Sequence, residues 1–248
     1  MNTLKLGRLY KKHLIESVGN KPSKNELSEV DEIMEKSHQN LNLNSNIKNL
    51  YDKKLAQIWP RIVANENSPD ELIILKKFVQ IRNNSNITSI ASGLGVFEMF
   101  LSRYFCPEGE ISCIDFSREM NKKGAEISRK IKLKNLKFIT ASATELPIRD
   151  NTQDIVLARR TGLSMKTIWN KVLREVNRVL LKNDKSRFVY TVQANLIPQK
   201  EKIKIQLRKN KLDFVSKKEF KESDGTKIAI IIAKPILKKR ALPSPTLK

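Results

Sequence analysis

Short apolar runs alternate with amphipathic stretches from residue 87 onward. Five of these runs have the composition of buried strands, and helical periodicity lies between most of them, around residues 97–104, 118–131 and 167–181. Strand, helix and strand repeating in this way predict a parallel sheet with helices on both faces. Ligands bind such sheets at the carboxyl ends of the strands. The predicted strands are ITSIA (87–91), ISCID (111–115), KFITA (137–141), DIVLA (154–158) and RFVYTVQ (187–193).

The pattern changes after the fifth predicted strand. The segment FVSKKEFKESDGTKIAIIIAKP (214–235) contains two strand-like runs separated by SDGT, and Asp-Gly is a strong hairpin signal. We therefore expect an α/β, Rossmann-like fold whose mostly parallel sheet ends in a C-terminal antiparallel hairpin.

Helices are predicted before the first strand. In SKNELSEVDEIMEK (23–36), Ser23 and Glu26 have the spacing of a capping box, and apolar residues fall on one helical face. A second amphipathic stretch covers residues 47–58 and ends near Pro60.

The third predicted helix start has the most complete set of sequence signals. Ser68 is a suitable N-cap, Pro69 fits the first helical position, and Glu71 completes a capping box. The expected organisation is an N-terminal helical extension or lid over residues 1–80, a main domain over 81–236 and a flexible basic tail over 237–248.

Basic residues outnumber acidic ones, 48 to 26, which gives a formal net charge of +22. Such a charge favours attraction to phosphate-rich partners or anionic surfaces. Because the basic residues are spread along the whole chain, an ordinary solvated surface explains them equally well. RNA or another polyanion is therefore one candidate partner, and the charge does not fix the fold.

The cysteine, histidine and apolar residues bear on the cellular location of the protein and on whether it has a membrane span or a metal site. Cys106 and Cys113 are predicted to be buried free thiols, which fits a reducing, cytoplasmic location. The longest apolar run, IAIIIA (228–233), is too short to cross a bilayer, and the N-terminus lacks the apolar stretch of a secretory signal. His13 and His38 are isolated in the polar N-terminal region, so we expect no metal site.

The stretch ITSIASGLGVFEMFL (87–101) combines a strand, a glycine turn and a helix start. Gly93 and Gly95 let the backbone turn tightly and let a ligand approach closely. A dinucleotide site would need a third glycine at position 98, where Glu98 instead repels a diphosphate. The loop therefore better suits a nucleoside without phosphates.

Asp115 ends the second predicted strand, 20 residues beyond Gly95. A carboxylate at this place can accept hydrogen bonds from both hydroxyls of a ribose, and Phe116 could cover an adenine ring. A strand-end Asp before Phe-Ser is equally typical of a helix cap. Asp115 is therefore interpreted either as a ribose-binding carboxylate or as a helix cap.

Four segments, in this order, resemble the motifs of class I S-adenosylmethionine-dependent methyltransferases, particularly the methyltransferase type 11 group. The resemblance runs from about Ile87 to Leu181. The matching segments are SIASGLG (89–95), similar to the D-x-G-x-G-x-G loop, CIDFSREM (113–120), similar to the ribose-binding strand end, ASATELPIRDNTQDIVLA (141–158), similar to the segment from Asp-Ala through Leu-Pro to the fourth strand, and LREVNRVLLKND (173–184), similar to the helix and turn before the fifth strand.

The resemblance implies S-adenosylmethionine as the cofactor and assigns roles to residues. Gly93 and Gly95 would pass close to the methionine part of the cofactor, and Asp115 would hold the ribose. The other implied roles belong to Phe116 or Met120, packed near adenine, the backbone of Ala143, at the adenine edge, and Arg159, facing the methyl-transfer site.

Three positions of the cofactor-binding motifs depart from the family pattern, and the turn before the fifth strand has KND (182–184) where Pro-Gly-Gly is common. Ser89 replaces the loop acid, Ala91 replaces the first glycine, and Ser142 replaces the acid that accepts from the adenine amino group. A neutral acceptor gives up roughly half the strength of a charge-assisted one, so we expect lowered cofactor affinity. Arg159 and Arg160 near an uncharged Ser89 would also make the pocket positive toward a cationic cofactor.

Two functions follow from these features. The first is an S-adenosylmethionine-dependent methyltransferase with RNA or a small molecule as acceptor. In-line methyl transfer demands proximity and orientation more than an acid or base, so no catalytic residue is assigned. The second is a catalytically degenerate, methyltransferase-like binding protein with a basic nucleic-acid-binding surface.

Overall fold

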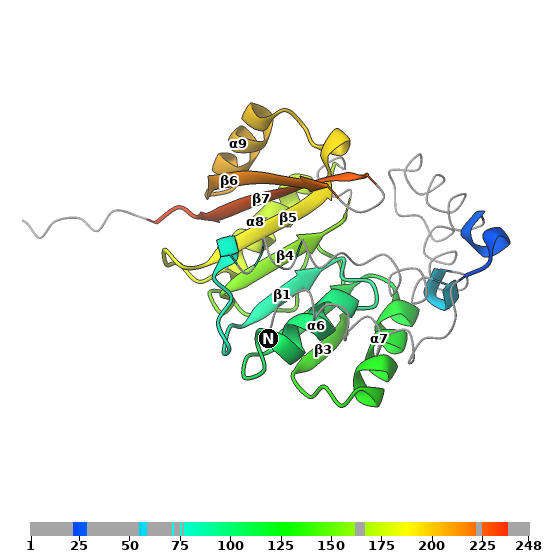
Figure 1. Cartoon of the computed structure of the whole chain (residues 1–248). Helices are drawn as coiled ribbons and strands as arrows, with labels where there is room; N and C mark the ends of the chain where they lie inside the picture. Colours follow the sequence, from blue (N-terminus) through cyan, green and yellow to red (C-terminus); the bar gives the residue numbers. More distant parts are fainter. Residues whose placement is uncertain are drawn as a thin grey trace, which may run out of the picture.

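A seven-stranded sheet forms the centre of the computed structural model, which describes residues 22–28, 55–58, 71, 75, 77–161, 167–221 and 225–237 (Figure 1). The strand order across the sheet is β3-β2-β1-β4-β5-β7-β6. The strands are β1 (Ile87–Ile90), β2 (Ile111–Asp115), β3 (Leu136–Thr140), β4 (Ile155–Arg159), β5 (Arg187–Gln193), β6 (Leu212–Lys221) and β7 (Lys227–Pro235).

The five strands predicted from the apolar runs are all present, and they run parallel. Their observed ends agree with the predicted ranges to within one residue. β1 lies between β2 and β4, so the strand order reverses at β1. Open parallel sheets bind ligands beside such a switch point, outside the carboxyl ends of the strands. The loops after β1, β2 and β4 therefore form the expected site.

The end of the chain forms the predicted hairpin. β7 pairs antiparallel with both β5 and β6. Gly225, in the turn that joins the two hairpin strands, has φ +92°, a conformation that glycine adopts readily. The expected Rossmann-like fold with an antiparallel C-terminal hairpin is confirmed.

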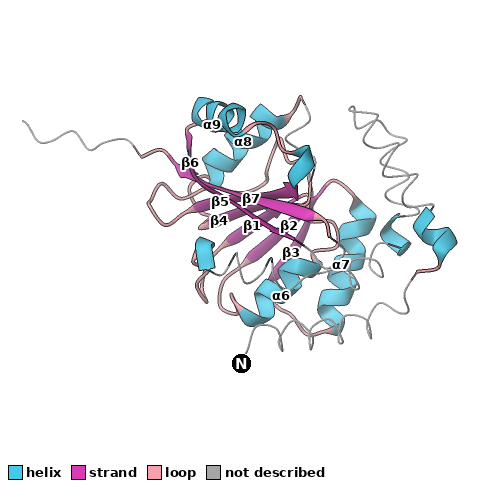
Figure 2. Ribbon diagram, turned by 45° about the horizontal axis from the view of Figure 1, so that its top comes forward, coloured by secondary structure: helices cyan, strands magenta, loops and turns pink. Residues whose placement is uncertain are grey.

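Helices cover both faces of the sheet (Figure 2). Residues of α6 (Val96–Tyr104) and α7 (Arg118–Lys130) join one buried cluster with Ile87 of β1, and residues of α8 (Trp169–Val179) and α9 (Lys200–Lys209) join another with Ile90. Neighbouring strand residues point to opposite faces, which separates the two clusters. The sequence patterns do not indicate α9, a lysine-rich helix that buries only Ile203 and Leu207. A short 3₁₀ helix, η3 (Ala194–Leu196), precedes it.

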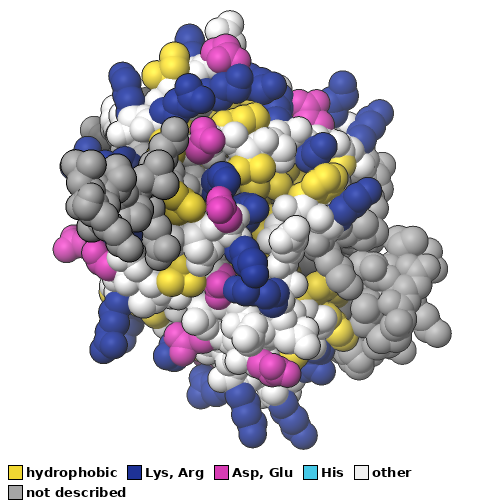
Figure 3. Space-filling model, turned by 90° about the vertical axis from the view of Figure 1, so that its left-hand side faces the viewer, with side chains coloured by type: hydrophobic (Ala, Val, Ile, Leu, Met, Phe, Trp, Pro, Cys, Tyr) yellow, Lys and Arg dark blue, Asp and Glu magenta, His cyan; other side chains and the backbone are white. Residues whose placement is uncertain are grey.

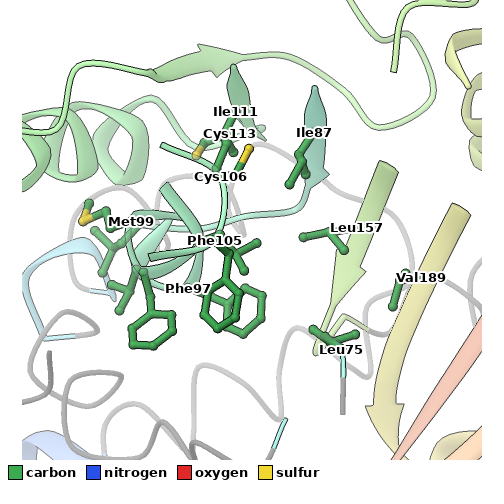
Figure 4. Packing of buried hydrophobic residues seen from close by; sticks show 14 of the residues in the cluster. Leu75, Ile87, Phe97, Met99, Phe105, Cys106, Ile111, Cys113, Leu157 and Val189 are labelled. Carbon is green, nitrogen blue, oxygen red and sulfur yellow. The ribbon is translucent and has the colours of Figure 1, made fainter. Parts of the chain in front are cut away.

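The N-terminal segment contributes to the larger core. Leu55 and Leu75 are fully buried, and Leu75 belongs to the same cluster as Leu157 of β4 and Val189 of β5 (Figure 4). Fully burying one such side chain stabilises a fold by about 1.5–3 kcal/mol. The described residues of the N-terminal segment therefore pack on the main domain. The chain divisions near residues 80 and 237 stay predictions, because most of residues 1–76 and all of residues 238–248 lie outside those described.

The first predicted capping box is confirmed. The Ser23 backbone N–H donates to Glu26 Oε2 at 2.8 Å, and the Glu26 N–H donates to Ser23 Oγ at 3.3 Å. These reciprocal bonds satisfy two amides at a helix start. In the third predicted box, Ser68 and Pro69 lie outside the described residues.

Both cysteines are buried and free, as predicted. The Cys106 thiol donates to the backbone oxygen of Ser85 at 2.8 Å. No helix in the described part of the chain has the length and apolar character needed to span a bilayer.

Candidate functional site

The loop between β1 and α6 is held in left-handed backbone conformations. Ala91, Gly93 and Gly95 have φ values of +53°, +55° and +66°. A Cβ atom on Gly95 would lie 2.9 Å from a ring carbon of Phe138 and 3.0 Å from the sulfur of Cys113. Glycine at position 95 is therefore required both by the backbone conformation and by the close approach of β2 and β3. Ala91 adopts a conformation that glycine would adopt at lower cost.

Asp115 joins the end of β2 to this loop. Its Oδ2 accepts from the Gly93 N–H at 2.8 Å, and its Oδ1 accepts from the Ser117 N–H at 2.9 Å. The N-cap of α7 is Ser117, whose Oγ accepts from the Met120 N–H at 3.2 Å. Asp115 therefore lies beside the glycine loop instead of serving as the N-cap itself. Its role as the ribose-binding carboxylate stays a prediction.

The side chains predicted to surround adenine differ in exposure. Met120 is buried, Phe116 is partly exposed, and Ala143 is partly buried against the cluster on the α8 side. Ser142 is exposed, and its Oγ lies 2.7 Å from Thr144 Oγ1. The roles of these residues stay predictions. Phe116 lies in the loop after β2, Met120 in the first turn of α7, and Ser142 and Ala143 in the loop after β3.

Arg178 of α8 holds the segment after β3, a role that the sequence patterns do not reveal. Its guanidinium donates to the backbone oxygens of Leu146 and Ile148, both at 2.8 Å, and forms ion pairs with Glu175 and Asp150. Glu175 Oε2 also accepts from the Leu146 N–H at 2.7 Å. Together these contacts fix the path of the chain just beyond Ser142.

Arg159 lies at the carboxyl end of β4, and its guanidinium is bound by Glu71. Arg159 Nε donates to Glu71 Oε1 at 2.9 Å and its NH2 nitrogen donates to Oε2 at 2.8 Å, while the guanidinium also lies 4.3 Å from the ring centre of Phe97. Arg160 forms a second ion pair with Glu71 at 3.3 Å, and Thr191 Oγ1 donates to the same carboxylate at 3.2 Å. Glu71 thus ties the N-terminal segment to the ends of β4 and β5.

The Glu71 carboxylate is fully buried. Burial raises its pKa, but the charges of Arg159 and Arg160 and the hydrogen bonds from Arg159 and Thr191 outweigh burial, so the pKa lies below its ordinary value. Glu71 is therefore ionised at neutral pH and offsets the positive charge expected at this rim.

Ser89 and Glu98 form a second buried polar contact beneath the loop. Ser89 Oγ lies 2.6 Å from Glu98 Oε1, and both residues are buried. Burial raises the pKa of Glu98 above its ordinary value, although the hydrogen bond from Ser89 and the charge of Arg159 act in the opposite direction. Glu98 therefore contacts Ser89 inside the protein, and the predicted repulsion of a diphosphate by Glu98 stays a prediction.

Lysine and arginine side chains are scattered over the face of the molecule seen in Figure 3, with acidic side chains between them. Among the residues whose structure is described, no three His, Cys, Asp or Glu side chains are grouped as metal ligands. His13 and His38 lie outside those residues.

The sheet order, with its antiparallel seventh strand, and the glycine loop beside Asp115 define the class I S-adenosylmethionine-dependent methyltransferase fold. A family model described as the ubiE/COQ5 methyltransferase family matches residues 70–204, which is more than half of the chain. The chain belongs to this family. Its members' chemistry implies S-adenosylmethionine as the cofactor.

Relatives and solved structures agree with this assignment. A demethylmenaquinone methyltransferase from Listeria welshimeri is 28% identical over 157 residues, covering 58% of this chain and 65% of the relative. One from Staphylococcus aureus is 26% identical over 163 residues, covering 65% of this chain and 58% of the relative. The chain thus spans less than two thirds of either relative's length.

Two solved structures show the same fold at 15% identity. A SAM-dependent methyltransferase from Aquifex aeolicus has a TM-score of 0.57, and the match covers 77% of this chain and 98% of the methyltransferase chain. The [4+2]-cyclase SpnF has a TM-score of 0.58, and the match covers 68% of this chain and 82% of the cyclase chain. Because a cyclase shares the fold, the fold alone does not fix the reaction.

Proposed function

We propose that this chain transfers a methyl group from S-adenosylmethionine to a reduced, quinone-type small molecule. The observation that carries the proposal is the hydrogen bond from the Gly93 N–H to Asp115. It holds a carboxylate beside the glycine loop, at the switch point of the sheet. Family membership supports methyl transfer as the reaction, and the relatives' names support the acceptor class.

The loop residues fit S-adenosylmethionine. The backbone of residues 91–95 is turned by left-handed conformations, and Ser92 Oγ is buried with no hydrogen-bond partner among the described residues. A buried hydroxyl without a partner is a polar group available to a ligand. When bound, S-adenosylmethionine supplies a methyl group on a positively charged sulfur. Asp115 would hold its ribose, and the backbone of Ala143 would contact the adenine edge.

Glu71 makes the rim compatible with a cationic cofactor. Arg159 and Arg160 alone would repel a sulfonium, but both bind the same buried carboxylate. One negative charge shared between two guanidinium groups lowers the positive potential that a cation would meet. This supports cofactor binding despite the neutral residue at position 89.

The residues of this chain contribute binding and orientation. Aligning the acceptor with the methyl group is the main demand of an in-line displacement, and we assign no acid or base. Glu71 bridges to the carboxyl ends of β4 and β5, so the N-terminal segment reaches the ligand side of the sheet. This supports the proposal that the segment covers the acceptor.

The acceptor class follows from the relatives' names, which specify demethylmenaquinone. An electrophilic methyl group requires an electron-rich acceptor carbon, which the reduced form of a quinone ring supplies. An RNA acceptor has less support, because the relatives' names specify a small molecule and, on the face seen in Figure 3, basic side chains are interspersed with acidic ones. The similar proteins give no support to a non-catalytic binding protein. We also propose a cytoplasmic location, supported by the two free thiols.

Calorimetric titration with S-adenosylmethionine and S-adenosylhomocysteine tests the cofactor site. We expect the wild-type protein to bind both, and Asp115→Asn to weaken both by about 10- to 100-fold, since charged hydrogen bonds contribute about 1.5–3 kcal/mol. Asp184→Asn is the matched control, because Asp184 precedes β5, is exposed and pairs with Lys234 of β7. A folded wild-type protein that binds neither ligand would support the non-catalytic alternative.

A methyl-transfer assay tests the acceptor. The protein is incubated with S-adenosylmethionine labelled in the methyl group and with either a reduced, water-soluble quinone lacking a ring methyl group or total RNA. We expect label in the quinone fraction only, and loss of that label with Asp115→Asn. Label in RNA alone would replace the proposed acceptor with a nucleic acid.

A further inference from the structure

Glu98 is a buried carboxylic acid that the proposed function does not use. It lies in the first turn of α6 and is 2% exposed. Residues 96–102 of this helix are all buried, and Glu98 is the one charged side chain among them. Burying a carboxyl group is unfavourable unless a partner compensates it. Its presence in an apolar helix face therefore calls for a physical explanation.

The groups that face Glu98 leave it without an ion-pair partner in the described part of the chain. Arg159 of β4 influences its charge, but the Arg159 guanidinium is bound by Glu71 through two hydrogen bonds. Glu71 itself repels a negative charge on Glu98. The Cys113 thiol of β2 is kept neutral by burial and by the nearby Glu98, which together raise its pKa well above its usual value. The Glu98 carboxylate is contacted by the uncharged Ser89 hydroxyl and by its own backbone N–H.

Ser89 and Glu98 stand on either side of the glycine loop. Ser89 is the third of the four residues of β1, and Glu98 follows the loop by three residues. The 2.6 Å contact between them therefore places a carboxyl group behind the position where the family pattern has its loop acid. A serine hydroxyl has one hydrogen to donate to that carboxylate and two lone pairs to offer to a cation.

We infer that Glu98, acting through Ser89, supplies the negative charge that position 89 lacks and becomes ionised when the cationic cofactor binds at the loop. The inference rests on the proposed cofactor site and makes Glu98 a positioning residue for it. Burial favours the neutral form of Glu98 in the free protein, and a nearby cation favours the ionised form. Cofactor binding is therefore coupled to proton release, and cofactor affinity rises with pH through the titration of Glu98.

Calorimetric titration in buffers with different ionisation enthalpies measures this coupling directly. We expect the wild-type protein to release protons on binding S-adenosylmethionine, and fewer on binding S-adenosylhomocysteine, whose sulfur is uncharged. Glu98→Gln should release none and should bind S-adenosylmethionine about tenfold more weakly, with a smaller loss for S-adenosylhomocysteine. Glu110→Gln, at an exposed carboxylate paired with Lys137, should behave as the wild type does.

A rescue variant separates charge from packing. The double variant Ser89→Asp, Glu98→Gln returns the acid to position 89 and should restore affinity for S-adenosylmethionine. A structural role for Glu98 predicts no rescue. Unchanged affinity and proton release in Glu98→Gln, or failure of the double variant to bind while folded, would overturn the inference. Absence of binding by the folded wild-type protein would instead overturn the proposed function.

Discussion

Glu71 and Arg159, 88 residues apart in the chain, form a bidentate ion pair with a Glu71 carboxylate that is entirely shielded from solvent. The pair connects the N-terminal segment to the carboxyl end of β4. Because Arg160 and Thr191 contact the same carboxylate, one side chain organises the ends of two adjacent strands. Glu71 is thus both part of the fold and part of the rim of the proposed site.

Replacing Glu71 with Gln should destabilise the protein by about 3–5 kcal/mol, because two guanidinium groups would be left without their buried counter-charge. Chemical denaturation at neutral pH measures this loss. Glu219→Gln removes the exposed partner of Lys217 and should leave stability unchanged, since exposed ion pairs contribute little. Equal effects of the two substitutions would contradict the special role of Glu71.

The stabilisation by Glu71 should also depend on pH. Its folded-state pKa lies below the ordinary value of 4.5, so its contribution is complete above the unfolded-state pKa and is lost as pH falls through the folded-state pKa. Denaturation curves of the wild type and Glu71→Gln should therefore converge as pH falls from neutrality to well below 4.5. A stability difference that stays constant over this range would count against ionisation of Glu71.

Ala91→Gly should stabilise the protein by roughly 0.5–1 kcal/mol, since relief of the left-handed strain exceeds the added entropy of glycine in the unfolded chain. The position has φ +53°. Ala125→Gly, within α7, should instead destabilise the protein by roughly 0.5–1 kcal/mol. Urea denaturation of both variants compares the same substitution in two backbone conformations. Destabilisation at both positions would show that Ala91 is not strained.

Local patterns predicted the fold because each strand and its following helix lie close together in the sequence. The strands predicted at residues 111–115 and 187–193 have the same bounds in the structure, since apolar runs between turns determine both ends. The interpretation of Asp115 needed the structure, because cap and loop contacts have the same sequence pattern. In the structure Asp115 accepts from the Gly93 N–H of the loop and from the Ser117 N–H, while Ser117 is the N-cap of α7.

Long-range polar contacts could not be predicted in the same way. The residues around Glu71 indicate a helix start, whereas its partners Arg159 and Thr191 come from distant strands. Glu98 did carry a signal in the sequence, since it is a lone acid among apolar residues that follow a glycine turn. Its contact with Ser89, however, depends on the angle at which α6 packs against β1.

The two cysteine thiols should not react with a thiol reagent in the native protein at neutral pH. Burial raises the pKa of Cys106 to about 11 and that of Cys113 well above its usual value, so few reactive thiolates exist. Both should react once the protein is denatured. With a reagent that releases a chromophore for each thiol it modifies, the absorbance gives the number of reactive thiols in the native and in the denatured protein. Rapid labelling of the native protein would contradict the burial of the two thiols.

Arg178→Lys should loosen the segment that follows β3. A lysine cannot reproduce the fork that donates to Leu146 and Ile148 while pairing with Glu175, so we expect a loss of about 1–3 kcal/mol in unfolding free energy. Arg174→Lys, at an exposed position of the same helix, is the control and should change stability little. Because Arg178 fixes the chain just beyond Ser142, its substitution should also weaken S-adenosylmethionine binding in calorimetry. Lowered stability with unchanged cofactor affinity would mean that this segment does not contribute to the adenine side of the site.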